Sequence, residues 1–241
     1  EGETYIAACP AAAALLSTFD IPKEAIQAAK VIVLDGYILE REALVRHIME
    51  LAAEFGTVVA LDVGSAAIAA QQAESIAAYC RNYPLFLFMN EEEAGAFYQA
   101  LNPVVNNEES EMEEESSFFE KKDMLTREIY AFFKKQTAHD LFPVIVIKLG
   151  PKGAIVFANG AVYREEALAV IPLETTGAGD TFCAAFLAAW IHGKSLAECI
   201  SLGNKVASQV LDVPGTHIDR QKLSQFAKAL SGAKGHIPEA Q

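Results

Sequence analysis

The stretch that decides the fold is Glu174-Thr175-Thr176-Gly177-Ala178-Gly179-Asp180-Thr181, which runs directly into the apolar segment from Phe182 to Trp190. Two glycines around an alanine predict a tight turn, because glycine adopts backbone conformations that other residues avoid. The small apolar residues that follow Asp180 predict a buried helix starting at this turn. Backbone N–H groups and the helix dipole favour an anion at a helix N-terminus. The stretch therefore predicts an anion site with a carboxylate beside it.

An anion site next to a carboxylate suits phosphoryl transfer to a hydroxyl group. The turn would hold the transferring phosphoryl group, and Asp180 would accept the proton of the alcohol. This interpretation rests on the residue types in the turn and on the position of the acid at the start of the helix.

The rest of the chain alternates short apolar runs with segments of helical period. The runs are too continuous for half-exposed strands and predict buried parallel strands. They cover residues 31–34, 57–61, 85–89 and 144–149. Strands that alternate with helices predict an α/β fold, with a doubly wound, mostly parallel sheet flanked by helices.

Polar side chains stand at or near the ends of these runs. They are Asp35, Asp62, Asn90 and Lys148. Because ligands of such sheets bind beyond the carboxyl ends of the strands, we expect these side chains to lie near a binding site.

The C-terminal part is expected to contain a hairpin and three helices. Asn159-Gly160, between the runs 153–158 and 161–163, is the usual residue pair of a type I′ turn. The expected helices cover about 180–192, 196–211 and 220–230.

The segment TTGAGDTFCAAF, residues 175–186, resembles the C-terminal signature of the ribokinase-like (PfkB) carbohydrate and nucleoside kinases. The resemblance implies a ribokinase-like fold and ATP-dependent phosphorylation of a sugar or nucleoside, with ATP and Mg²⁺. It implies that Asp180 is the catalytic base and that Gly177, Ala178 and Gly179 form the anion hole. A monovalent cation is left open, because Glu174 stands where the family often has Asp.

Asn90 and Glu93 follow a predicted strand and share one face of a first helical turn. They resemble the family's Asn-x-x-Glu motif, which implies that they help to hold the Mg²⁺–phosphate group and its waters. The alternative is an Asn that caps the helix, with the Glu completing a capping box.

The family also implies further nucleotide-binding residues, namely Lys148, Gly150, Gly153 and Asn204. The first three resemble its strand-and-glycine turn near ATP, where Gly150 would allow close approach of the nucleotide. The spacing is not that of a P-loop, and the alternative is a plain β-turn. Asn204 matches a position that lines the adenine pocket, and its alternative is a solvent-facing helical Asn.

Two residues near these motifs have plainer interpretations. Asp62 is not carried over from the family, because Gly64 stands where many sugar kinases have Asn. Cys183, three residues after Asp180, is interpreted as a thiol of the core rather than a nucleophile.

Composition limits the partners. The net charge of −13 argues against nucleic acid or an anionic membrane as a partner. No apolar run reaches the roughly 18 residues of a bilayer span. Four scattered cysteines without a CxxC pair favour a reduced, cytoplasmic protein. The expected partner is a small-molecule sugar or nucleoside, and a homodimer is left open.

The whole chain, residues 1–241, is interpreted as one kinase domain that lacks the N-terminal part of the family, including most of its β-sheet lid. Residues 1–9 are similar to the last lid strand of adenosine-kinase-like members. Residues 106–120 are dense in acidic side chains and predict a mobile insertion. The competing hypothesis is a non-catalytic nucleotide- or sugar-binding relative, or a fragment. A Rossmann dehydrogenase is disfavoured, since no G-x-G-x-x-G follows the first strand.

Overall fold

The computed structural model describes residues 14–103, 127–137, 143–211 and 220–231. The expectations for a lid strand at 1–9 and for an acidic insertion at 106–120 fall outside the described residues.

A six-stranded sheet runs through the described part of the chain, with its strands in the order β1-β2-β3-β4-β5-β6. The strands are β1 (Val31–Asp35), β2 (Val58–Asp62), β3 (Leu85–Asn90), β4 (Val144–Lys148), β5 (Ala154–Ala158) and β6 (Ala161–Glu165). The first four are parallel to one another, and β5 and β6 continue the sheet in antiparallel fashion. Asn159 and Gly160 join the last two strands with φ of 51° and 66°. Positive φ at both positions is what a type I′ hairpin turn requires.

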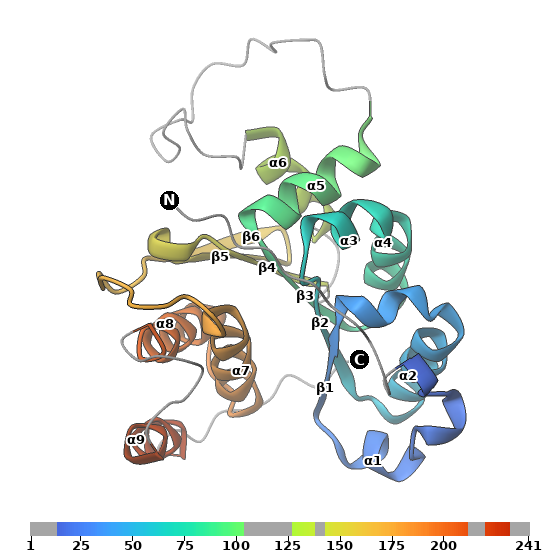
Figure 1. Ribbon diagram of the computed structural model, residues 1–241, viewed down its shortest axis with the longest axis horizontal. Coiled ribbons are helices and arrows are strands. Elements are labelled where there is room, and N and C mark those ends of the chain that lie inside the picture. The colour runs from blue at the N-terminus through green and yellow to red at the C-terminus, as the bar shows by residue number, and fades with distance from the viewer. Residues whose placement is uncertain (1–13, 104–126, 138–142, 212–219, 232–241) are drawn as a thin grey trace.

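Helices cover both faces of this sheet, as Figure 1 shows. One face carries α1 (Lys23–Ala28), α2 (Glu42–Phe55), α3 (Ala66–Gln71), α4 (Ala73–Asn82), α5 (Glu91–Leu101) and α6 (Arg127–Gln136). The other carries α7 (Ala178–Ile191), α8 (Leu196–Ala207) and α9 (Arg220–Ser231). Short 3₁₀ helices lie at η2 (Thr18–Asp20), η3 (Gly36–Glu40) and η5 (Gly150–Lys152). The predicted fold class, a mostly parallel sheet flanked by helices, is confirmed.

Side chains of the central strands alternate between two apolar layers. In β3, Leu85, Leu87 and Met89 pack into the layer of α2 to α6, whereas Phe86 and Phe88 face the layer of α7 to α9. Both sets are buried, because each face of the sheet is covered by helices. This is why the sequence of such a strand is continuously apolar.

The edge strand β1 differs from the prediction of a buried strand. Only Leu34 is buried in it, and Val33 on the opposite face is 62% exposed. The reason is position, because β1 has only β2 as a neighbour among the described strands.

The layer on the α7 side is built around aromatic rings. Phe186 of α7 meets Phe86 and Phe88 of β3 edge-on, with ring centroids 5.9 and 5.5 Å apart. Such edge-to-face pairs add to the free energy gained from burying the rings. Helix α8 approaches α7 closely, since a Cβ on Gly203 would lie 2.7 Å from the Phe182 ring.

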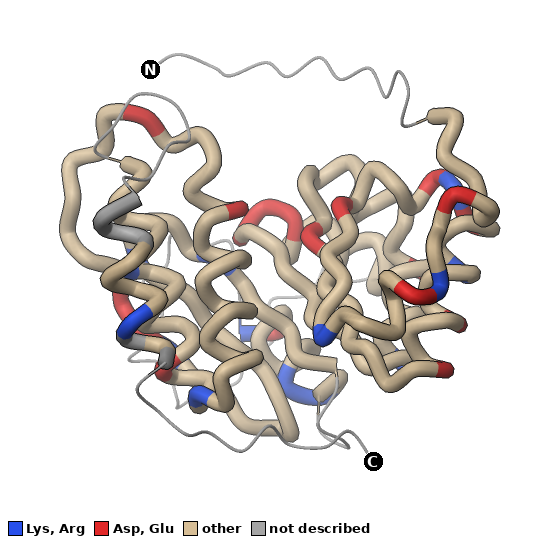
Figure 2. The backbone as a smooth tube through the Cα atoms, turned by 90° about the horizontal axis from the view of Figure 1, so that it is seen from below, with Lys and Arg blue, Asp and Glu red and all other residues tan. Residues whose placement is uncertain are grey.

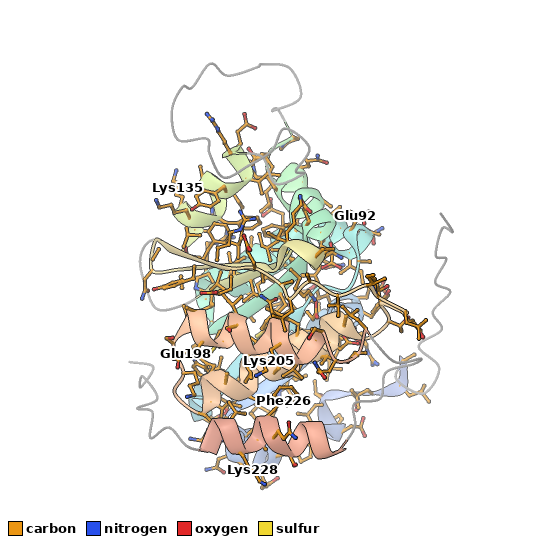
Figure 3. The ribbon with its side chains drawn as sticks, turned by 90° about the vertical axis from the view of Figure 1, so that its left-hand side faces the viewer. Glu92, Lys135, Glu198, Lys205, Phe226 and Lys228 are labelled. Carbon is orange, nitrogen blue, oxygen red and sulfur yellow. The ribbon has the colours of Figure 1, made fainter. Side chains whose placement is uncertain are left out.

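Helix α9 lies beside α8 and extends the same layer. Lys205 of α8 and Phe226 of α9 face each other, with the ammonium 5.9 Å from the ring centroid (Figure 3). Leu230 of α9 is buried in the layer. The expected helix at 220–230 therefore forms.

Two helix bounds differ from the expectation. Helix α7 begins at Ala178, two residues before Asp180, because the turn itself supplies its first residues. Helix α8 ends at Ala207 rather than near Leu211. Beyond it the backbone hydrogen bonds join residues three apart, as in a 3₁₀ helix. Gln209 N–H donates to Val206 O, and Val210 N–H donates to Ala207 O.

No helix in the described ranges has both the length and the apolar character needed to cross a bilayer. Lys and Arg positions are scattered along the described backbone rather than gathered on one surface (Figure 2).

The aromatic layer can be tested by a matched pair of substitutions. Phe186→Ala removes a fully buried ring and should lower the free energy of unfolding by about 3–5 kcal/mol. Phe19→Ala removes a ring that is 98% exposed and should change it by less than about 0.5 kcal/mol. Urea denaturation of both variants measures the difference. Similar values for the two would contradict the packing described.

Candidate active site

The carboxyl ends of the central strands bring the expected polar side chains to one edge of the sheet. In the strand register, Asp35 is the partner of Asp62, and Asn90 is the partner of Lys148. The N-terminal turn of α7 reaches the same edge. A Cβ on Gly179 would lie 3.4 Å from Lys148 Nζ.

The turn before α7 has the geometry that its glycines predict. Gly177 is the N-cap and has φ of 76°, in the left-handed region that favours glycine. Asp180 lies in the first turn of the helix and is exposed. The Ala178 N–H donates to Thr175 O at 3.2 Å, so this amide closes the turn instead of pointing freely toward an anion.

Lys148 forms a largely buried ion pair with Asp62. Its Nζ donates to Oδ1 at 2.9 Å and to Oδ2 at 2.8 Å, and both side chains are 17% exposed. The Cys183 thiol donates to Asp62 Oδ2 at 3.2 Å and lies 3.7 Å from Lys148 Nζ. Cys183 is buried, as its interpretation as a core thiol requires. The family motif did not assign a role to Asp62, because Gly64 two residues later departs from the motif. The sequence signal that did indicate a site residue was a charged side chain at the end of an apolar strand.

Protonation states in this group follow from burial and from neighbouring charges. Burial acts to lower the pKa of Lys148, but the charge and hydrogen bonds of Asp62, together with Glu93, outweigh it and raise that pKa overall. Burial raises the pKa of the Cys183 thiol well above its usual range. At neutral pH Lys148 is therefore an ammonium and Cys183 a neutral thiol.

Asn90 and Glu93 form a complete capping box at the start of α5. The Glu93 N–H donates to Asn90 Oδ1, and Asn90 N donates to Glu93 Oε2, both at 2.8 Å. Asn90 Nδ2 donates to Glu93 Oε1 at 2.9 Å. Burial raises the pKa of Glu93, although the bond from the Asn90 backbone opposes this. The capping alternative thus describes the geometry present, and a role at Mg²⁺ stays a prediction.

No three His, Cys, Asp or Glu side chains converge on a common point within the described ranges in a way that could hold a metal ion.

A cavity of about 550 Å³ lies between the β4–β5 turn, residues 167–172, the start of α7 and the C-terminal end of α8 with the residues just after it. Six of the predicted site residues line it, namely Lys148, Gly150, Gly153, Ala178, Gly179 and Asn204. Most other lining side chains are apolar, Ile171, Phe182 and Leu211 among them. The size and lining are those of a small-molecule site.

Gly153 and Asn204 both contact the backbone at the end of β6, where the chain enters the wall of this cavity. Gly153 has φ of 90°, and a Cβ there would lie 1.9 Å from Glu165 O. Asn204 Nδ2 donates to Glu165 O at 3.2 Å and to Glu166 O at 3.1 Å. Asn204 is only 8% exposed, so the solvent-facing alternative is wrong. The two residues hold the wall in place.

Gly150 has a different role in the turn. Its φ is 56°, yet a Cβ there would meet nothing within 4 Å. The backbone conformation, not the available space, favours glycine at this position.

The family model described as "pfkB family carbohydrate kinase" matches residues 1–223, and the chain therefore belongs to the PfkB family.

Several curated proteins are similar to the chain. It is 32% identical over 152 residues to 2-dehydro-3-deoxygluconokinase of Haemophilus influenzae, covering 60% of this chain and 45% of that protein. It is 40% identical over 73 residues to a ribokinase of Arabidopsis thaliana, covering 30% of this chain and 19% of that protein. The chain spans less than half the length of these relatives.

Solved structures share the fold at lower identity. Adenosine kinase from Sinorhizobium meliloti aligns with a TM-score of 0.70 and 20% identity, over 89% of this chain and 58% of that chain. A probable sugar kinase from Rhizobium etli aligns with a TM-score of 0.71 and 18% identity, over 90% and 59%. These similarities show the ribokinase-like fold.

The two glycines of the β4–β5 turn give a matched test of the cavity wall. Gly150→Ala adds only the strain of a positive φ and should cost about 1–3 kcal/mol of unfolding free energy. Gly153→Ala adds a collision with Glu165 O, worth about 1–3 kcal/mol more. Urea denaturation compares them. An equal loss in both variants would contradict the role given to Gly153.

Proposed function

We propose that the protein is an ATP-dependent kinase that transfers the γ-phosphoryl group to a hydroxyl of a sugar or nucleoside. The observation that carries this proposal is the left-handed turn at Gly177, which sets Asp180 in the first turn of α7. Its neighbour Gly179 lines the cavity and approaches Lys148 Nζ. In the proposed reaction, Asp180 accepts the proton of the acceptor hydroxyl as the phosphoryl group arrives.

The other predicted site residues at the carboxyl ends of the central strands would bind and orient the nucleotide. The apolar cavity next to α8 suits the base. The start of α7 at Gly179, rather than the Ala178 amide that closes the turn, suits the phosphoryl group being transferred. Lys148 supplies a fixed positive charge at the phosphate end of this cavity. In phosphoryl transfer, such positioning and electrostatic stabilisation supply most of the catalysis.

Magnesium would enter with the nucleotide. When bound, it neutralises charge on the phosphate oxygens. Asn90 and Glu93 lie at the end of β3, next to Lys148 in the sheet, where they could orient waters of the metal. A neighbour of this fold, a ribokinase II-like protein of Escherichia coli, was solved in complex with ATP and Mg²⁺.

The relatives support an acceptor of the sugar or nucleoside class. Their names include a 2-dehydro-3-deoxygluconokinase, a ribokinase and an adenosine kinase. We also infer a reducing, cytoplasmic location, which suits the free thiols of Cys80, Cys183 and Cys199.

The proposal is tested by Asp180→Asn in the full-length protein. The amide keeps the shape of the side chain but removes the basic oxygen, so kcat should fall by about 10²–10⁴-fold while ATP affinity changes little. Steady-state kinetics over a panel of sugars and nucleosides, with nucleotide titration of the same preparation, measures both quantities.

The matched control is Glu50→Gln on α2, which removes the same charge from an exposed position. It should leave kcat unchanged. Turnover close to wild type in Asp180→Asn would rule out the base. Nucleotide binding without turnover on any acceptor would favour the competing hypothesis of a non-catalytic relative.

A further inference from the structure

The buried group of Asp62, Lys148 and Cys183 is only partly explained by the proposed function. Removing two opposite charges from water is expensive unless they are paired and hydrogen-bonded. Here the carboxylate accepts two bonds from the Lys148 ammonium and one from the Cys183 thiol. The arrangement joins β2, β4 and α7, which are distant from one another in the sequence.

The position of the ammonium links this group to the turn before α7. Lys148 Nζ is the atom that a Cβ on Gly179 would meet, at 3.4 Å. Cys183 lies four residues after Gly179, about one helical turn along the same helix. The carboxylate of Asp62 is therefore held from α7 as well as from the strands, directly behind the predicted anion hole.

We propose that Asp62 is a positioning residue for phosphoryl binding: its carboxylate, oriented by the Cys183 thiol, holds the Lys148 ammonium against the turn at Gly179, where it meets the phosphates of the nucleotide. This inference rests on the proposed function. The contrasting role is a staple that joins β2 to β4 without any effect on phosphates.

Hydrogen-bond chemistry explains how the ammonium can serve both partners. Lys148 has three N–H donors. Two are engaged by the carboxylate oxygens, and the third points toward Cys183 Sγ at 3.7 Å, a weak acceptor. A phosphate oxygen is a far stronger acceptor than a thiol sulfur. A nucleotide can therefore recruit the third donor while Asp62 keeps the other two in place.

The charges that face Lys148 come from several elements. The Asp62 carboxylate approaches from β2 and Glu93 from α5, and the neutral Cys183 thiol lies beside the ammonium on α7. Only Asp62 makes a direct ion pair with the ammonium among the described residues. Its removal should therefore displace the ammonium, whereas removal of a carboxylate away from this group should not.

The test measures the affinity of the protein for ATP with Mg²⁺ and for AMP, which lacks the β- and γ-phosphates. General damage to the cavity would weaken the binding of ATP and AMP alike, so it would leave the ratio of the two affinities unchanged. Asp62→Asn should lower the ATP-to-AMP ratio by about ten-fold, within the range that contacting pairs show. Glu50→Gln on α2 is the matched control, because it removes a carboxylate from an exposed position away from this group, and it should leave the ratio unchanged.

The double variant gives a result that a staple would not produce. Lys148→Met should lower the ratio by about ten-fold or more, because it leaves the Asp62 carboxylate unpaired near the phosphates. Adding Asp62→Asn to Lys148→Met should then raise the ratio, the opposite sign to its effect alone. The double variant carries no buried charge at these positions, so it is expected to fold even where a single variant does not.

The cysteine supplies an independent test without any change of charge. Cys183→Ala removes the donor to Asp62 and should lower the ATP-to-AMP ratio by about two- to five-fold, and Cys183→Ser should keep it near wild type. Equal weakening of ATP and AMP, or an unchanged ratio in both Asp62→Asn and Cys183→Ala, would overturn the inference. Wild-type protein that binds neither nucleotide would instead contradict the proposed function.

Discussion

The constraint on which the rest of the structure depends is the burial of the sheet on both faces. Helices α2 to α6 cover one face and α7 to α9 the other, so the central strands carry apolar side chains throughout. Charged groups are therefore confined to the ends of these strands. At the carboxyl edge, Asp62, Asn90 and Lys148 come together, and α7 adds the turn at Gly177. Packing of the core thus determines where chemistry can occur.

Much of this arrangement was predictable from the sequence. Continuous apolar runs located the strands, and the Asn159–Gly160 pair located the hairpin, because both signals are local. The exposure of Val33 was not predictable, since it depends on what lies beside β1. The sequence predicted too long a helix α8, because helical periodicity does not distinguish an α-helix from the tighter turns that follow it before Leu211.

The sequence predicted which residues belong to the candidate site, but not which of them contact one another. Sequence motifs singled out Asp180, Lys148, Gly153 and Asn204, and the last three line one cavity. They did not reveal that Gly153 and Asn204 fix the same stretch of backbone at Glu165. The contact of Asp62 with Cys183 joins residues 121 apart in sequence, a distance that no local pattern spans. One fold hosts different activities in different proteins, and the residues of the site determine which activity is present.

The central claim is that the turn before α7 and the adjoining cavity form a nucleotide site. Its most direct test is the melting temperature of the protein as a function of ATP–Mg²⁺ concentration. Binding to the folded state should stabilise it by RT ln(1 + [L]/Kd), about 2.7 kcal/mol at a hundred times Kd, or roughly 5–10 °C for a chain of this size. The account predicts a melting temperature that rises steadily with ligand. A folded protein whose melting temperature stays constant up to millimolar ATP–Mg²⁺ would contradict it.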